Sequence, residues 1–443
     1  KTKQVFPGLT IGLILGSYLV KPSIIGGIEQ SINYIVDSLT DINNIKIIVF
    51  LYMFSGLVGI IKISGGIKGF VDFASNKIDT KKEALIVTWL STLGTFSAPS
   101  FRIVTIAPIM KALLSKINMT KKELAFMIET STQPVIVLIP IATAFVGYMV
   151  SVIEMGLQNQ NIDADPYSLY LQSIPFNFFA ISMIIIGTIF VIFRHSSKNN
   201  IPITNESDNV KTDNKDTVEQ SKPWNLIIPV SLVIILTLFL TWLDGFSQGY
   251  HLFEAFIEAD VLQAMVVALF ITLLITIVML LFQKNSLKTM IHEFIESGNN
   301  LMSVILLLSV VWGLSSVTED LGLSEFVTNN VSWIPSSFIP PVMFIIGAFI
   351  SYFIGSSWGT WGILMPLGIS LAQAGDANLP LVIGAVFASG SFGSFASPLS
   401  DNNNTIAGIL EINAMDYAKY KLLPAMISAV IATGLFLLLS FLL

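Results

Sequence analysis

Long apolar runs separated by short polar segments make up most of this chain of 443 residues. The runs have about 16–23 residues, the length of helix that crosses a hydrocarbon core about 30 Å thick. Full membrane spans are expected near 6–20, 46–63, 124–152, 172–193, 224–243, 260–282, 298–317, 380–410 and 422–443. The pattern therefore predicts an all-α, polytopic membrane protein.

Two further apolar stretches, 84–114 and 338–373, are each interrupted in the middle by Gly, Ser, Thr and Pro. Irregular backbone at membrane depth occurs only where protein or a water-filled cavity covers it. We therefore expect each stretch to form a re-entrant helical hairpin that enters and leaves the membrane by the same side.

Composition supports a membrane protein and excludes other classes. Hydrophobic residues make up 53% of the chain and charged residues 12%, whereas a soluble domain carries roughly 25% charged residues. So few charges, most of them between apolar runs, exclude a nucleic-acid binder. The chain has no cysteine, which excludes disulfides and Cys-ligated metal sites.

The basic residues predict the orientation, because Lys and Arg concentrate in cytoplasmic loops. Lysines precede the first expected span, follow the second and flank the first hairpin. All lie on one side of the membrane if 84–114 is re-entrant. We expect a multi-pass protein of the cell membrane with a cytoplasmic N-terminus.

Three short strings recur at an offset of about 256–265 residues, and each pair occupies the same topological position. GIKGFV at 66–71 pairs with GLSEFV at 322–327, TLGTF at 92–96 with SWGTW at 357–361, and QPV at 133–135 with SPL at 397–399. The span at 224–243 crosses once between the halves, so the repeats are expected to have inverted topology. Inverted repeats with broken helices are typical of secondary transporters.

The predicted organisation has four parts. Residues 1–193 form the first transmembrane repeat, and 194–223 form a flexible cytoplasmic loop, rich in Asn, Asp, Lys, Thr and Ser. Residues 224–259 contain the linking span, and 260–443 form the second repeat.

The richest polar cluster lies inside the apolar span at 380–410. Pro398 prevents a regular helix there, and the freed carbonyls with Asp401 suit Na⁺. Asp401 could equally take up a proton. The candidate cation and proton ligands are Asp401, Ser397, Ser400, Asn402, Asn403 and Thr405. The alternative is a polar loop past the membrane with Asp401 as a helix cap, since a straight helix from Leu381 would place Asp401 roughly 30 Å along its axis.

The first half has a counterpart around Glu129, which follows four apolar residues and precedes Gln133 and Pro134. A buried carboxylate here requires a partner or a watery cavity, so Glu129 is a second candidate for cation or proton binding. The alternative is a first-turn Glu near the cytoplasmic surface.

The hairpin tips supply candidate substrate ligands, because half-helix N-termini attract anions. Arg102 is expected to pair with Asp401 or Glu129, or to bind a substrate carboxylate; the alternative is that it reaches the interface by snorkelling. The candidate substrate-binding residues are Ser356, Ser357, Gly359, Thr360, Thr92, Thr95, Arg102 and Gln133.

An enzyme is not expected. The three histidines lie in or near loops, and His292 lacks the second His of a zinc-binding helix. No cofactor is expected other than Na⁺ or H⁺ as coupling ions.

Several of these strings resemble the NhaC-type sodium/proton antiporters of the ion transporter superfamily. The resemblance rests on SWGT at 357–360, FGSFASPLSD at 392–401, PIMK at 108–111 and ELAFMIE at 123–129, followed by Pro134 and Pro140. It implies inverted repeats with re-entrant hairpins and a homodimer with a scaffold and a moving transport part. This chain has Ser394 where the family has Asp and Asn402 where it has Thr, and it lacks the acidic residues expected between Ala84 and Thr92.

The hypothesis is a secondary active transporter of the Na⁺/H⁺ antiporter kind, working by alternating access with Asp401 and Glu129 as exchangeable carboxylates. The alternative is Na⁺- or H⁺-coupled transport or exchange of a small organic acid, amino acid or other metabolite on the same scaffold. A passive channel or a transporter-like sensor is a third possibility. The expected partners are membrane lipid, the transported ion or metabolite and a second copy of the chain.

Overall fold

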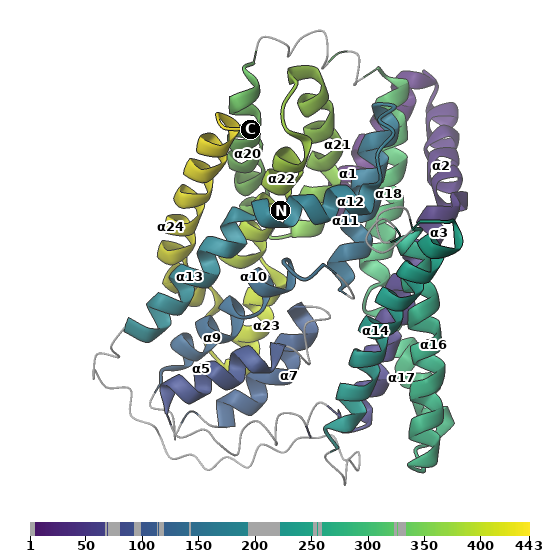
Figure 1. Ribbon diagram of the computed structural model, residues 1–443. Coiled ribbons are helices and arrows are strands. Elements are labelled where there is room, and N and C mark those ends of the chain that lie inside the picture. Colours follow the sequence, from purple (N-terminus) through teal and green to yellow (C-terminus); the bar gives the residue numbers. More distant parts are fainter. Residues whose placement is uncertain are drawn as a thin grey trace.

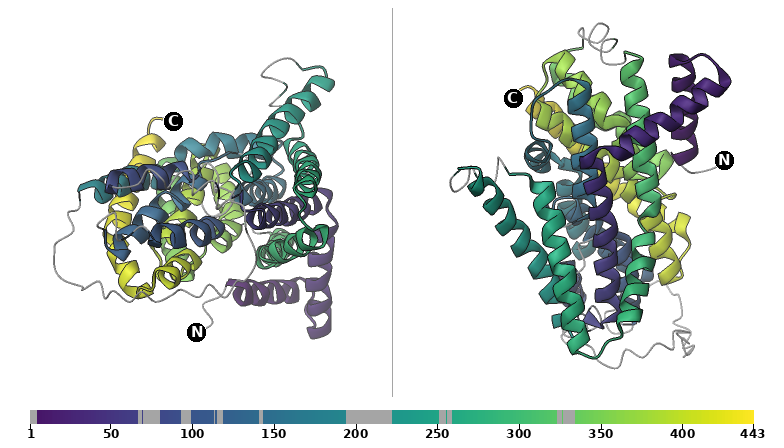
Figure 2. Two further views of the ribbon diagram at one scale, coloured as in Figure 1. Left: turned by 90° about the horizontal axis from the view of Figure 1, so that it is seen from below. Right: turned by 90° about the vertical axis from the view of Figure 1, so that its right-hand side faces the viewer.

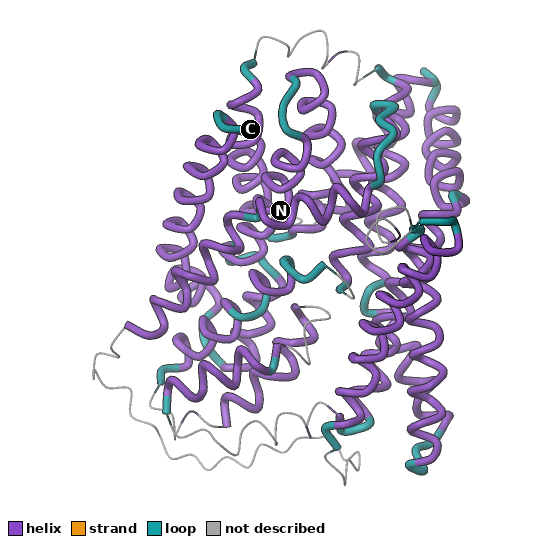
Figure 3. Tube along the Cα trace, in the orientation of Figure 1, coloured by secondary structure: helices purple, strands orange, loops and turns teal. Residues whose placement is uncertain are grey.

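In a computed structural model, the residues whose structure is described are 5–66, 69, 80–92, 99–112, 114, 119–140, 143–193, 222–250, 255, 259–322, 326 and 334–443. These residues form helices and connecting turns and no strand (Figure 3). The first-half helices are α1 (Val5–Val20), α2 (Ile24–Thr40), α3 (Ile42–Ile63), α5 (Lys81–Leu90), α7 (Pro99–Ala112), α9 (Lys121–Thr130), α10 (Gln133–Ile136), α11 (Ala144–Asn159), α12 (Pro166–Ser173) and α13 (Phe178–Phe193).

The rest of the described chain is equally helical. Its helices are α14 (Trp224–Ser247), α16 (Val261–Phe282), α17 (Leu287–Asn299), α18 (Met302–Asp320), α20 (Ile339–Ile354), α21 (Ser357–Gly375), α22 (Leu379–Ala396), α23 (Asp401–Leu410) and α24 (Ala414–Ser440). Short 3₁₀ turns, η1 (Ile174–Phe176) and η2 (Ser336–Phe338), precede α13 and α20.

Among the described residues, eight helices are long and apolar enough to cross a membrane. They are Ile42–Ile63, Pro166–Phe193, Trp224–Ser247, Val261–Phe282, Met302–Asp320, Ser336–Ile354, Leu379–Leu410 and Ala414–Ser440. The pair Phe6–Val20 and Ile24–Thr40 also passes this test together, with a bend of 117°. The chain is a multi-pass, all-α membrane protein, as predicted.

The expected span at 124–152 differs from the prediction because it is interrupted twice. Helix α9 ends at Thr130, the four-residue α10 follows, and α11 begins only at Ala144. Pro134 lies at the start of α10, and Pro140 lies between α10 and α11. Each proline lacks the backbone N–H that a continuous helix requires.

Two amphipathic helices, α2 and α17, were not expected from the apolar runs. Polar residues such as Glu29 and Asp37 recur along α2, and His292 and Glu293 lie within α17. A helix with one apolar face does not produce an uninterrupted apolar run, so hydropathy alone misses it.

The packing of the first half is repeated in the second. Helices α1 and α2 pack against α18, and α16 and α17 pack against α3. Likewise α7 packs against α23, and α21 packs against α11. The hairpin helices α5 and α7 lie at one end of the molecule and α20 and α21 at the other (Figure 1). The two halves therefore form inverted repeats, as predicted; the predicted domain boundaries stay predictions.

The second hairpin turns at Gly355, whose φ of +75° lies in the left-handed region that glycine tolerates. Ser356 then caps α21, because its side chain accepts a hydrogen bond from the Gly359 amide. In the first hairpin, α5 ends with Ser91 at its C-cap and α7 begins at Pro99. Residues 93–98, including Thr95, lie outside the described residues.

Helix α22 is the central helix of the site region, since Leu381 through Ala396 are all buried. It packs most extensively on α20, and small residues bring the two backbones together. A Cβ on Gly393 would lie 2.2 Å from the backbone carbonyl carbon of Ser351. The Ser351 hydroxyl also donates to the Ser389 carbonyl, at 2.7 Å.

The helices gather into two groups, which the left view of Figure 2 separates. One group contains α1, α2, α3, α14, α16, α17 and α18, and the other contains the two hairpins, α9, α13, α22, α23 and α24. Helices α11 and α21 pack on one another and on α18, so they join the groups.

Candidate functional site

The break between α22 and α23, residues 397–400, is held by serine hydroxyls. Ser397 Oγ donates to the Tyr352 carbonyl of α20, at 2.6 Å, and accepts from the Leu399 amide, at 3.1 Å. Ser400 Oγ donates to the Ser394 carbonyl, at 2.6 Å. Ser397 and Ser400, both predicted cation ligands, therefore stabilise the shape of the break. Each hydroxyl donates its hydrogen bond to a backbone carbonyl oxygen.

Asp401 is the first residue of α23, directly after this break, and its side chain is exposed. The structure thus places the carboxylate at the surface of the chain and not in a closed interior site. Ser400, not Asp401, occupies the N-cap position. The positive end of the helix dipole favours a negative charge in this first turn.

The two residues that follow Asp401 in sequence, Asn402 and Asn403, have buried amides. Asn402 Nδ2 donates to Gln133 Oε1 of α10 at 3.5 Å, the outer limit for a hydrogen bond. Asn403 Nδ2 donates to the Ala414 carbonyl, at 3.2 Å. Within the described chain, Gln133 Nε2 and Asn403 Oδ1 are buried without a hydrogen-bond partner. The two broken helices therefore meet at polar groups that have unused donor and acceptor capacity. Thr405, one turn further along α23, is half-buried.

The break after α9 is organised by Arg102 of α7, which has no exposed surface. Its Nε donates to Thr132 Oγ1 at 3.0 Å, and its Nη2 donates to Ser131 Oγ at 2.9 Å. The guanidinium also donates to Ser91 Oγ and to the Thr88 carbonyl, at 3.0 and 2.5 Å. Arg102 therefore joins the end of α5 to the break and does not snorkel to the surface.

The described residues next to each hairpin turn contact a helix break. In the first half, Thr92 Oγ1 donates to the Ser131 carbonyl, at 3.2 Å. In the second half, a Cβ on Gly355 would lie 2.7 Å from the backbone of Leu399. The predicted tip residues Ser357 and Thr360 are buried next to this contact. The two candidate regions thus have the same construction.

The tip of the second hairpin also carries an aromatic cluster. Tyr148 of α11 donates its hydroxyl to the Trp358 carbonyl, at 2.5 Å, and Trp361 Nε1 donates to the Phe387 carbonyl, at 3.0 Å. Thr360 Oγ1 donates to the Ser356 carbonyl, at 2.9 Å. The rings of Tyr148, Trp358 and Trp361 pack on one another. This packing holds the first turns of α21 against α11.

Glu129 is fully buried and has two partners on α24. Lys421 Nζ lies 2.7 and 2.8 Å from its two carboxylate oxygens, and the Tyr417 hydroxyl donates to Oε2 at 2.5 Å. None of the three side chains has exposed surface. Glu129 is therefore not a first-turn surface residue.

Lys421 and Tyr417 were not among the residues predicted for the site. The expected last span started at 422, so Lys421 fell just outside it, whereas α24 already begins at Ala414. Residues 417 and 421 are four apart and face the same way on a helix. The available signal was a pair of lysines, Lys419 and Lys421, at the start of this otherwise largely hydrophobic 27-residue stretch.

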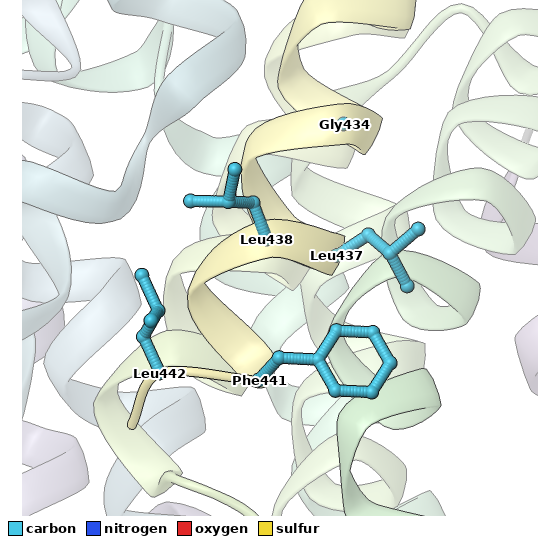
Figure 4. Close-up of a pocket in the computed structure, with 5 residues that line it drawn as sticks. All are labelled: Gly434, Leu437, Leu438, Phe441 and Leu442. Carbon is cyan, nitrogen blue, oxygen red and sulfur yellow. The ribbon is translucent and has the colours of Figure 1, made fainter.

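The chain also has an apolar pocket near the end of α24, which is a different kind of site. It is lined by Gly434, Leu437, Leu438, Phe441 and Leu442 (Figure 4). Apolar side chains offer no ligand for an ion or a carboxylate, so this surface suits a lipid chain.

The chain is similar in sequence to known antiporters. Residues 135–441 match the Na⁺/H⁺ antiporter family. An uncharacterized protein of Haemophilus influenzae is 23% identical over 95% of this chain and 84% of its own length. The malate-2H⁺/Na⁺-lactate antiporter of Bacillus subtilis is 26% identical over 47% of this chain and 43% of its own length.

Two solved transporters share the fold. MtrF of Neisseria gonorrhoeae, from a class of antimetabolite efflux pumps, has a TM-score of 0.69 and 16% identity, covering 94% of this chain and 85% of MtrF. The YdaH transporter of Alcanivorax borkumensis, with an unusual topology, has a TM-score of 0.65 and 12% identity, covering 93% of this chain and 88% of YdaH.

Proposed function

Because the chain belongs to the Na⁺/H⁺ antiporter family, we propose that it is a secondary antiporter of the cell membrane that exchanges Na⁺ for H⁺ by alternating access. Asp401 is the exchanging carboxylate, since one carboxylate that holds either ion but not both is sufficient for coupled exchange. The basic segments support a cytoplasmic N-terminus. The protein works as a homodimer, as the resemblance implies.

One observation carries this proposal: the exposed Asp401 directly follows a helix break and is followed in sequence by the buried residues Asn402 and Asn403. The carboxylate can exchange ions with water, and neutral oxygens of the break can complete the shell of a hard cation. Broken helices of this kind form coupling-ion sites in secondary transporters.

The test is Na⁺ uptake into proteoliposomes driven by a pH gradient. Asp401→Asn should reduce this uptake to the level of empty vesicles, because Asn keeps the shape and removes the charge. Asp416→Asn is the matched control, since Asp416 is also an exposed first-turn aspartate, on α24. Unchanged coupled uptake in Asp401→Asn would refute the role of Asp401, and Na⁺ flux without proton countertransport would indicate a channel.

A second candidate function, exchange of a small organic acid, is favoured by Gln133. Its buried Nε2 has no partner among the described residues and could donate to a substrate carboxylate. The similarity to the malate/lactate antiporter suggests which acids to try. Gln133→Leu should abolish malate or lactate counterflow, and Gln158→Leu on the exposed face of α11 should not. Absence of counterflow in the wild-type protein would eliminate this candidate.

A further inference from the structure

The surroundings of Lys421 form a complete cation site. The Glu129 carboxylate holds the ammonium group through both oxygens, at 2.7 and 2.8 Å. The ring centroids of Tyr417 and Phe395 lie 4.7 and 5.2 Å from Nζ. Aromatic faces attract cations most strongly where water is excluded. The site thus has a carboxylate, a phenol and two aromatic faces. The cation that occupies it is the ammonium group of Lys421.

The charges in this region balance without any free ion. Glu129 and Lys421 are both fully buried and form a neutral pair. Nearby charged groups have other contacts: Arg102 donates to the break residues Ser131 and Thr132, and Glu123 belongs to the capping box at the start of α9. A Na⁺ ion at Glu129 would therefore add an uncompensated charge to the interior unless Lys421 moved away.

A tethered cation also has an advantage over a free one. Lys421 is one turn from Tyr417 on a packed helix, so its ammonium is held at a high effective concentration beside Glu129. A free Na⁺ ion must also lose most of its hydration to enter.

We propose that Lys421 acts as a built-in cation that occupies the cation position of Glu129 and excludes Na⁺ from this carboxylate. Lys421 is then a specificity-determining residue, and Na⁺ binding in this protein depends on other ligands. This inference rests on the proposed function in one respect, namely that Na⁺ is an ion that this protein transports.

Lys421→Ala tests the proposal, because it should open a Na⁺ site. Thermal unfolding of the purified full chain is followed from low to high Na⁺, with choline keeping the ionic strength constant. The midpoint of Lys421→Ala should rise with Na⁺ by a few degrees more than that of the wild type, as a bound ligand stabilises the folded state. The double variant Lys421→Ala, Glu129→Gln should lose this gain.

Two further variants separate a specific site from a general effect. Lys421→Met retains most of the side-chain volume and should show the same Na⁺ gain, so the outcome does not depend on one variant folding. Lys46→Ala breaks the partly exposed ion pair with Asp260 and should gain no Na⁺ response.

No Na⁺ gain in either Lys421 variant would make the ion pair merely structural and overturn the proposal. A wild-type Na⁺ response that disappears in Lys421→Met, Glu129→Gln would also overturn it, because Na⁺ would then bind Glu129 with Lys421 present. These binding results do not require transport, whereas the proposed function fails if Asp401→Asn retains coupled uptake.

Discussion

Arg102 Nε lies 3.0 Å from the hydroxyl oxygen of Thr132, and this contact fixes the break after α9 to the first hairpin. Together with the bonds to Ser131, Ser91 and the Thr88 carbonyl, it makes Arg102 a link between three segments. A guanidinium fits this role because its five N–H donors have a fixed planar geometry.

Arg102→Met should destabilise the protein by about 3 kcal/mol, because it removes several buried charge-assisted hydrogen bonds and leaves their acceptors unsatisfied. Thermal or denaturant unfolding in detergent measures the loss. Arg102→Lys should recover only part of it, since an ammonium has three donors on one atom. If Arg102→Met reduced the unfolding free energy no more than substitutions of exposed surface residues do, the break would not depend on Arg102.

Gly393→Ala should destabilise the protein by about 2 kcal/mol, because overpacking forces a backbone shift. Its new Cβ would lie 2.2 Å from the Ser351 carbonyl carbon, and this backbone cannot rotate away. Gly408→Ala is the control, since a Cβ there has nothing within 4 Å, and it should stabilise α23 by about 0.5 kcal/mol. Equal effects of the two substitutions on the unfolding midpoint would contradict the close packing of α20 and α22.

Glu411 makes stability depend on pH at one end of the molecule. The hydrogen bonds and charges of Lys111 and Lys121 lower the pKa of this exposed carboxyl, which lies between α23 and α24. A carboxyl whose folded pKa lies below its unfolded pKa, about 4.3, contributes its full stability above that unfolded value. The contribution is lost as the pH falls through the lowered folded pKa.

The difference in unfolding midpoint between the wild type and Glu411→Gln should therefore be constant from neutral pH to about 5.5 and then shrink as the pH falls toward the lowered pKa. Glutamine has the same backbone preference at φ +53°, so the comparison isolates the charge. Surface pairs contribute about 0–1 kcal/mol, and high salt should reduce the difference. A difference that grows on acidification would contradict the sign of the pKa shift.

The chain has no cysteine, so single cysteines can test the orientation of the hairpins. Lys82→Cys and Lys121→Cys flank the first hairpin and should react with an impermeant thiol reagent from the same face of the membrane. Ser337→Cys and Asp376→Cys flank the second hairpin and should react from the opposite face. Labelling of positions 82 and 121 from different faces would contradict the re-entrant arrangement.

The sequence was sufficient to predict the helix breaks at Gly355 and Pro398 because Gly and Pro act locally, whereas the re-entrant course of the hairpins stays a prediction. Gly355 has the left-handed conformation that ends α20, and Pro398 lies within the break after α22. Each requirement is set by the residue itself, so it can be read without knowing the neighbours. The repeated strings then indicated the inverted arrangement.

The partners of the charged residues could not be predicted in this way. Glu129 meets a lysine 292 positions later, and Arg102 binds hydroxyls that no charge pattern distinguishes. The exposure of Asp401 was also not predictable, because burial depends on how α23 packs against α7 and α9. Contacts between distant segments are decided by tertiary packing.

Each hairpin packs on a broken helix of the other half, and this arrangement has a consequence for biosynthesis. Helix α7 packs on α23, which the ribosome makes roughly 290 residues later. At about 5–20 residues per second, this interval lasts roughly 15–60 s. During that time α7 has no native neighbour from the second half, although the hydrogen-bond partners of Arg102, at residues 88–132, have already been synthesised. The face of α7 that packs on α23 is therefore covered only after almost the whole chain has been synthesised.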